Sequence, residues 1–115
     1  VQGQGWLTIE EVNWKSNGQI TTFSPSTYKI PAVGDIPKIF NVEIFKRGRN
    51  TENVVNKAKT TGEPPLMLAM SVFFAIKDAI ASVGKYKLIP KIDGPATSEK
   101  ILMSLKDLKS RMNYN

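Results

Sequence analysis

The sequence contains no cysteine and no histidine among its 115 residues. The lack of cysteine excludes disulfide bonds, thiolate metal sites and cysteine nucleophiles. The lack of histidine excludes a Ser-His-Asp triad, a histidine-ligated zinc site and an imidazole general base. Any acid–base chemistry of this chain therefore depends on a carboxylate, a lysine, a tyrosine or a bound cofactor.

Long hydrophobic runs are also scarce. The most apolar stretch, residues 66–76, is interrupted by Ser71 and followed at once by Lys77 and Asp78. It is shorter than the roughly 20 residues that a bilayer-spanning helix needs, so no membrane partner is expected. No targeting segment is recognisable, and the chain begins with Val1 rather than Met. We expect a cytoplasmic chain that is part of a longer polypeptide.

The charge is one-sided, with 16 Lys and Arg against 10 Asp and Glu and a net charge of +6. Residues 46–59 form the most basic stretch. Clustered basic side chains attract nucleic acid, but this stretch has no regular face and no interleaved aromatic residues. A solvated loop is the favoured interpretation, and no nucleic-acid partner is expected. The alternative function is a small, basic, non-enzymatic binding module for anionic partners.

The length indicates one domain or part of one, covering residues 1–115. We expect an α+β fold that begins with a short helix, which two early glycines weaken. A hairpin is predicted in residues 12–23, where Asn17 and Gly18 would supply the positive φ angles of a tight two-residue turn. Residues 40–45 alternate between apolar and polar side chains and predict a further strand.

Two helices are predicted in the second half of the chain. A long buried helix is expected at about 65–83, with Gly84 as its stop. Its first three turns are apolar on nearly every side, so it requires packing on several faces and suggests a partner outside this chain. An amphipathic helix is expected at about 97–112, with Thr97 as N-cap. Its apolar positions are Ile101, Leu105, Leu108 and Met112.

The stretch Gly62-Glu63-Pro64-Pro65 is the candidate for chemistry. The two prolines restrict the backbone around the carboxylate, and Gly62 leaves space for another group to approach. The start of the helix favours ionised Glu63, whereas burial would oppose ionisation. A carboxylate under both influences suits a general base. The alternative interpretation is that Glu63 only complements the N-terminus of the helix.

Several further blocks stand out beside this stretch. With it they are Val1–Gly3, Gly5–Thr8, Pro25–Pro31, Gly48–Asn50, Gly62–Leu66 with its helix through Ser71–Ala79, and Gly94–Thr97. Together these blocks resemble the molybdenum hydroxylases, the family of xanthine dehydrogenases and aldehyde oxidases, in the C-terminal part of their molybdopterin-binding subunit. The similarity runs in the same order over nearly the whole chain and looks most like the bacterial large subunit.

The resemblance implies hydroxylation of a purine, or of an aldehyde, with molybdenum-molybdopterin as cofactor. Glu63 corresponds to the general base, which takes the proton of the hydroxyl group that attacks the substrate. Gly62 and Lys59 are implied cofactor-binding residues, and no metal ligand is assigned. The partners implied are the rest of the molybdopterin-binding subunit and an FeS/FAD subunit that carries FAD and 2Fe-2S clusters. Thr60-Thr61 departs from an apolar pair of the family, and the isolated chain is expected to be inactive.

Overall fold

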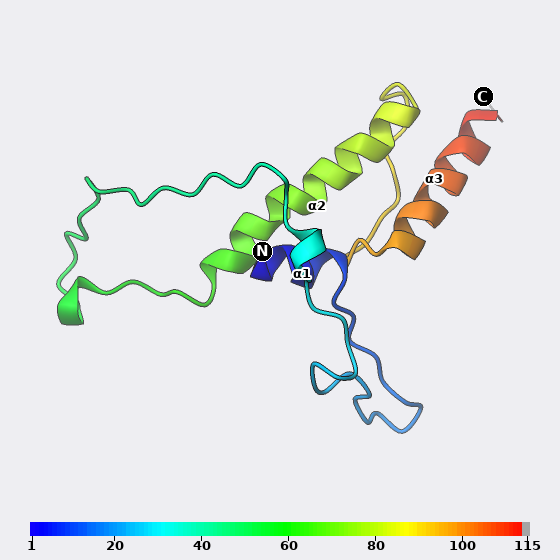
Figure 1. Cartoon of the computed structure of the whole chain (residues 1–115). Coiled ribbons are helices and arrows are strands. Elements are labelled where there is room, and N and C mark those ends of the chain that lie inside the picture. Colours follow the sequence, from blue (N-terminus) through cyan, green and yellow to red (C-terminus); the bar gives the residue numbers. More distant parts are fainter. Residues whose placement is uncertain (114–115) are drawn as a thin grey trace.

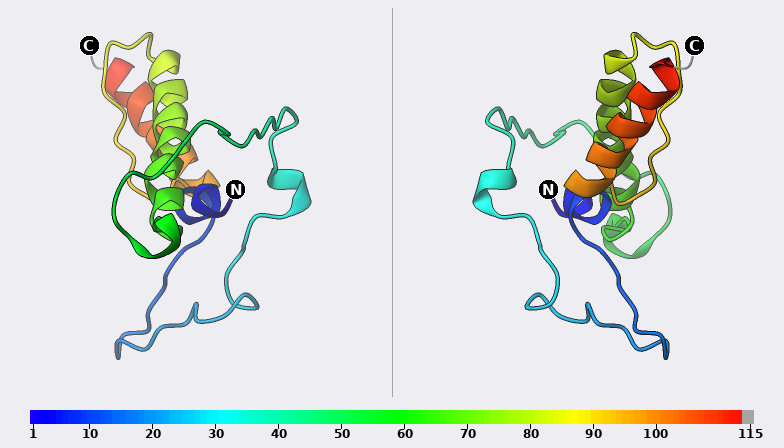
Figure 2. Two further views of the ribbon diagram at one scale, coloured as in Figure 1. Left: turned by 90° about the vertical axis from the view of Figure 1, so that its left-hand side faces the viewer. Right: turned by 90° about the vertical axis from the view of Figure 1, so that its right-hand side faces the viewer.

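The computed structural model of the chain describes residues 1–113. The helices found there are α1 (Gln2–Thr8), α2 (Pro64–Val83) and α3 (Ser98–Asn113), with short 3-10 helices at Val33–Asp35 and Val55–Lys57. Long irregular segments connect them. α1 lies against the beginning of α2, and α3 runs beside α2 in the same direction (Figures 1 and 2).

The expected N-terminal helix is confirmed as α1, and its two glycines are the residues that it buries. A side chain at Gly3 would overlap Pro65 and Ala69 of α2, and one at Gly5 would lie 2.6 Å from Cγ of Pro31. Glycine disfavours a helix in isolation because of its backbone entropy. Here it is placed where the helix backbone touches its neighbours, so packing outweighs propensity.

The long helix is confirmed almost to the residue, but its burial is not. Pro64 and Pro65 occupy its first positions, where a missing N–H group has no intrahelical partner to lose. Within α2 the buried residues are Ala69 and Ile80, whereas Leu68 is 72% exposed. The expectation of a buried helix is therefore wrong for this chain, because α1 and α3 cover only narrow stripes of α2.

The helix ends at Gly84 as expected, but for a different reason. Gly84 has a φ of −88°, and the left-handed residues are Lys85 and Tyr86. The backbone N–H of Tyr86 donates to the carbonyl oxygen of Ala81 at 3.0 Å and closes the helix end. A Cβ at Gly84 would lie 3.3 Å from Leu108. Glycine at this position therefore serves the contact with α3.

By length and composition, α2 passes as a possible membrane span, with a mean hydropathy of 1.8. The apolar stretch was expected to be too short, but the helix continues through Lys77 and Asp78 to reach 20 residues. The core helix of a soluble protein passes the same test. Such a core helix is mostly buried, whereas only 11% of this apolar window is buried in the described structure, where α1 and α3 pack on α2.

The amphipathic C-terminal helix is confirmed as α3. Thr97 precedes it, and the Thr97 Oγ1 accepts a long hydrogen bond of 3.4 Å from the N–H of Lys100, as an N-cap does. Leu108 has an exposed fraction of 0%, and its neighbours on the predicted apolar face are half-buried. The spacing of apolar residues therefore identified the face that packs on α2.

The predicted hairpin is reduced to a single antiparallel bridge between Trp14 and Ile20. The N–H of Lys15 donates to Gln19 and that of Gly18 to Lys15, both at 2.9 Å, and only Gly18 of the turn has a positive φ, at 81°. This is a three-residue turn with glycine at its left-handed position. The expectation of a two-residue turn was wrong, because Asn17 does not have a positive φ.

The strand expected at residues 40–45 does not form in the described part of the chain. The segment is irregular, and Phe40, Val42, Ile44 and Phe45 are all exposed. A strand requires a neighbour that satisfies its backbone N–H and C=O groups. No segment within residues 1–113 pairs with this one, so its alternating pattern has no sheet to join.

The chain is extended for its length. Its radius of gyration is 18.5 Å, whereas a compact chain of about 100 residues has about 13 Å. Among the described residues the buried apolar side chains are those of Ala69, Ile80, Pro90, Ala96 and Leu108. The structure is thus that of a partial domain with helices, one bridge and a small core. It supports the α component of the predicted α+β class far better than the β component.

Candidate functional site

Glu63 stands at the N-cap of α2. Its backbone is helical, with φ −78° and ψ −37°, although a residue before proline usually prefers an extended conformation. Its carbonyl oxygen accepts hydrogen bonds from Leu66 at 3.0 Å and Met67 at 3.4 Å. The carboxylate makes no capping hydrogen bond, and the residue is exposed. The side chain is therefore not occupied in closing the helix end, and the expected burial is not provided by this chain.

A groove of about 660 Å³ lies where the beginning of α1 meets the first turns of α2. Its polar lining residues are Gln2, Gln4, Thr60 and Thr61. Gly62 and Glu63 connect Thr61 to Pro64, and both of these line the groove. Glu63 is thus a close neighbour in sequence of two residues that line the groove, although it is not itself a lining residue.

The region beside Gly62 is open. A Cβ built at Gly62 would meet no atom of the chain within 4 Å, in agreement with the expected room for another group. Lys59 is exposed and lies on a separate shallow pocket with Arg49 and Asn50. Gly62, Glu63 and Lys59 are all absent from the groove lining, although each lies within two residues of a lining residue. The assignment of Gly62 and Lys59 to cofactor binding stays a prediction.

Sequence reasoning missed the side chains that α1 contributes to the groove. Gln2 and Gln4 carry amide groups, and the Nε2 of Gln4 donates to the carbonyl oxygen of Asp35 at 3.0 Å. The signal that could have found them is that Val1–Gly3 is one of the blocks with family likeness. Two blocks distant in sequence thus contribute to the groove, Val1–Gly3 through all three residues and the block that begins at Gly62 through Pro64 and Pro65.

α1 joins the other blocks as well. Gly5 lies against Pro31, the last residue of the block at Pro25–Pro31. The carbonyl oxygen of Leu7 accepts a hydrogen bond of 2.7 Å from the N–H of Ala96, in the block Gly94–Thr97. Segments from both ends of the chain therefore converge on one seven-residue helix, which holds the groove together.

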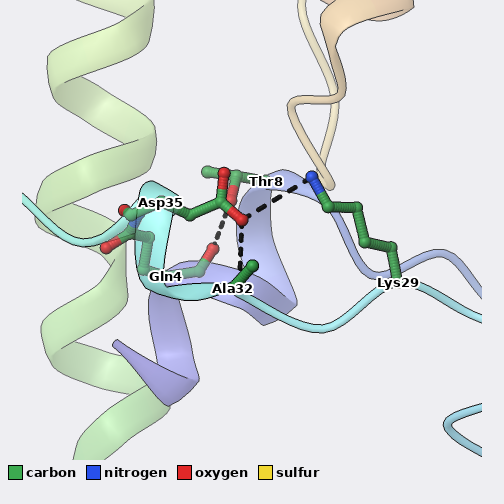
Figure 3. Close-up of polar contacts among 5 residues, drawn as sticks. All are labelled: Gln4, Thr8, Lys29, Ala32 and Asp35. Atoms are coloured by element: carbon green, nitrogen blue, oxygen red, sulfur yellow. Dashed lines mark hydrogen bonds and ion pairs between the residues drawn. The ribbon is translucent and has the colours of Figure 1, made fainter.

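A small polar cluster fixes the segment 29–35 to α1 (Figure 3). The Asp35 carboxylate accepts a hydrogen bond of 2.9 Å from the N–H of Ala32 and lies 3.6 Å from the ammonium of Lys29. The Ala32 hydrogen bond is the main cause that lowers the pKa of Asp35, and the positive charge of Lys29 also contributes. Ionised Asp35 thereby stabilises the turn at residues 32–35. The backbone carbonyl oxygen of Asp35 in this turn accepts the hydrogen bond from Gln4.

We expect this cluster to keep its stability throughout neutral pH. Because the pKa of Asp35 is lowered by folding, its contribution is complete above the ordinary carboxyl pKa and is lost only as the pH falls through the lowered value. Hydrogen exchange of the Ala32 amide in the full-length protein, corrected for intrinsic rate, should show constant protection from about pH 5 to pH 8. Asp35→Asn should reduce that protection, whereas Asp93→Asn in an exposed loop should not. Protection that falls as the pH rises would contradict this account.

The basic stretch is a solvated loop, as expected. Residues 46–59 are almost entirely exposed, and Asn50 donates to the carbonyl oxygens of Lys57 and Ala58. The ammonium of Lys57 donates to the carbonyl oxygen of Glu52 at 2.9 Å. One of the basic groups is thus engaged within the loop.

Comparison with known proteins finds similar sequences for the segments that meet at α1. Residues 1–37 match the family described as molybdopterin cofactor-binding domain. Xanthine dehydrogenase/oxidase of Felis catus is 42% identical over 97% of this chain, and that of Rattus norvegicus is 45% identical over 88%. Xanthine dehydrogenase 1 of Arabidopsis thaliana is 41% identical over 93%.

The chain spans only 9% of the length of the Felis catus protein and 8% of the other two. The relatives named here are animal and plant proteins, and the likeness to the bacterial subunit stays a prediction. The similarity nevertheless extends over nearly the whole chain and includes Gly62–Pro65. The chain belongs to the xanthine dehydrogenase family, as a segment of its molybdopterin cofactor-binding region.

Proposed function

We propose that this segment supplies the general base of a molybdenum hydroxylase that oxidises a purine, with an aldehyde as the alternative substrate. The observation that carries the proposal is the position of Glu63 in the chain between Thr61 and Pro64, which line the groove between α1 and α2, with no capping bond on its carboxylate. The names of the relatives, which are xanthine dehydrogenases, support the reaction class.

The residues at the groove fit one edge of a pterin cofactor. The groove combines amide and hydroxyl side chains with apolar ones such as Leu68, and a Cβ at Gly62 would meet only open space. Pterins are flat, with hydrogen-bonding edges, so this mixture suits them. The described residues contain no cluster of three acidic, histidine or cysteine side chains for a metal. A metal at this place would therefore be held through its cofactor or by the rest of the subunit.

The chain's own part in the reaction is proton transfer. Molybdopterin, when bound, supplies the redox-active metal that takes up the electrons of the substrate. A carboxylate oxygen of Glu63 accepts the proton of the hydroxyl group that attacks the substrate carbon. The prolines that follow hold its backbone in place. A general base in such a position typically accelerates a reaction by about 10²–10⁴-fold.

The remainder of the subunit completes the site and covers α2. Met67, Leu68 and Phe74 are more than half exposed in this chain, and large exposed apolar surfaces mark interaction sites. An FeS/FAD subunit or domain, carrying FAD and 2Fe-2S clusters, receives the electrons. Cytoplasmic localisation, without membrane or nucleic-acid partners, belongs to the same proposal.

The direct test is purification of the full-length protein that contains this segment. We expect molybdenum and a fluorescent pterin to co-purify with it, and turnover of xanthine, hypoxanthine or an aldehyde to be detectable. Protein without either cofactor component that binds nucleic acid with strong salt dependence would instead support the binding module for anionic partners. Metal analysis, pterin fluorescence and a salt series distinguish the two functions.

The isolated chain of 115 residues should hold no cofactor. The chain forms the groove, but the chain is extended and the groove is open to solvent. We expect no pterin fluorescence and no turnover from the purified segment, measured beside the full-length protein as positive control. Release of pterin from the segment would contradict this expectation.

A further inference from the structure

We propose that Gly3 is a positioning residue for Glu63, because the missing side chain at Gly3 lets α1 set the place of the first turn of α2. This inference rests on the proposed function of Glu63. It begins with the contact between the two helices. A Cβ at Gly3 would overlap the carbonyl oxygen of Pro65 and lie 2.7 Å from the Cβ of Ala69. Such a distance is shorter than real Cβ contacts, so any side chain at residue 3 forces the helices apart.

The contacted atoms cannot move out of the way by themselves. The carbonyl oxygen of Pro65 belongs to the backbone, and the Cβ of Ala69 is fixed to the helix. Gly3 and Ala69 are both buried. A displacement at this contact is therefore a displacement of a whole helix turn, since no flexible side-chain end is available to absorb it.

The first turn of α2 transmits this displacement to Glu63. Pro65 follows Glu63 by two residues, and the intervening Pro64 has a fixed φ. The carbonyl oxygen of Glu63 is bound to the N–H groups of Leu66 and Met67 at 3.0 and 3.4 Å. Glu63 and the contacted Pro65 thus belong to one stiff turn, so a displacement of Pro65 also displaces Glu63.

α1 itself is held on its other sides, so the turn of α2 is the part that yields. Leu7 is bound to Ala96 at 2.7 Å, and Gln4 is bound to Asp35 at 3.0 Å. By contrast, the chain that leads into α2 is irregular, and Gly62 has open space beside it. An enlarged residue at position 3 therefore moves Glu63 relative to anything bound in the groove.

The test is Gly3→Ala in the full-length, cofactor-loaded enzyme. A misplacement of about 1 Å can reduce a catalysed rate by about 10²-fold. We expect kcat to fall by roughly 10–100-fold, with KM and the molybdenum and pterin content near those of the parent enzyme. A merely structural role would lower the amount of loaded enzyme and leave the kcat per molybdenum unchanged.

The matched control is Gly5→Ala on the same helix. Gly5 is also buried, but a Cβ there meets Pro31 and Glu10 rather than α2. We expect this variant to lower stability without the loss of kcat per molybdenum. Gly34→Ala, where a Cβ meets no atom within 4 Å, controls for the substitution itself. An equal loss of kcat in Gly5→Ala, or none in Gly3→Ala, overturns the proposal.

A second variant covers the case in which Gly3→Ala does not load cofactor. Ala69→Ser adds one oxygen atom on the α2 side of the same contact and should lower kcat per molybdenum in the same direction. An unchanged kcat in a loaded Ala69→Ser enzyme would also overturn the proposal. The turnover of Glu63→Gln separates the proposed function of Glu63 from the positioning role of Gly3. If Glu63→Gln retains activity, Glu63 is not the general base. If Glu63→Gln is inactive but Gly3→Ala is fully active, only the role of Gly3 is removed.

Discussion

Replacing Glu63 by glutamine in the full-length enzyme is expected to lower kcat by at least about 10²-fold and by as much as about 10⁴-fold. Glutamine has nearly the same shape as glutamate but cannot accept the proton. The carboxylate makes no capping hydrogen bond, so the start of α2 should be unaffected. Molybdenum and pterin content should remain at the level of the parent enzyme, and steady-state kinetics per bound molybdenum measures the effect.

Glu52→Gln is the control for this prediction. Glu52 is exposed in the loop before α2 and does not line the groove, so the same chemical change should leave kcat within about twofold of the parent value. Near-normal turnover in Glu63→Gln would leave only the other interpretation, that Glu63 complements the N-terminus of α2. A loss of cofactor together with activity would show that Glu63 maintains the structure of the groove rather than accepting the proton.

The second large effect is expected at Leu108 in α3. Leu108 has an exposed fraction of 0%, and its Cδ2 lies close to Gly84 at the end of α2. Truncation to alanine removes buried methyl groups and leaves a cavity, which typically costs about 2–5 kcal/mol. Native-state hydrogen exchange of the α3 amides in the full-length protein should show a lower free energy of local opening by that amount.

Leu102→Ala supplies the matched comparison on the same helix. Leu102 is 52% exposed, so an identical truncation there should change the opening free energy by no more than about 0.5 kcal/mol. Equal losses in the two variants would mean that the rest of the subunit buries both faces of α3. Unchanged exchange in Leu108→Ala would mean that α3 does not pack on α2 as described.

The helices could be predicted from the sequence because their signals are local. The paired prolines mark the beginning of α2, and spacings of four, three and four residues mark the apolar face of α3 around Leu108. The role of Gly3 could not be predicted, since its partners, Pro65 and Ala69, are distant in sequence. Helix propensity alone predicts that such a glycine destabilises α1, whereas in the structure it allows close contact between α1 and α2.

The β part could not be predicted well, because strands depend on neighbours. The turn at Gly18 was located correctly, but its length is decided by which backbone groups pair across it. Residues 40–45 have the alternation of a strand without a partner in the described chain. The prediction that α2 is buried was wrong for the same reason. The pattern shows which apolar residues require a packing partner, but it does not show whether this chain supplies that partner.

At the site, the sequence led to Glu63 and Gly62 through a short motif, and to the family through several blocks in order. It did not reveal the groove, since Gln2 and Thr61 meet there only through the packing of α1 on α2. The position of Lys59 outside the groove likewise depends on the path of an irregular loop. The local restriction of the backbone could thus be inferred from the sequence, whereas the contact between distant segments could be seen only in the structure.

The most direct measurement is an experimental structure of the full-length protein with its cofactor and a slow substrate bound. The account predicts that a carboxylate oxygen of Glu63 lies within hydrogen-bonding reach, about 2.6–3.2 Å, of the hydroxyl group that attacks the substrate, with α1 seated on the first turn of α2. A carboxylate directed away from the cofactor into solvent, on the opposite side of that turn, would contradict it.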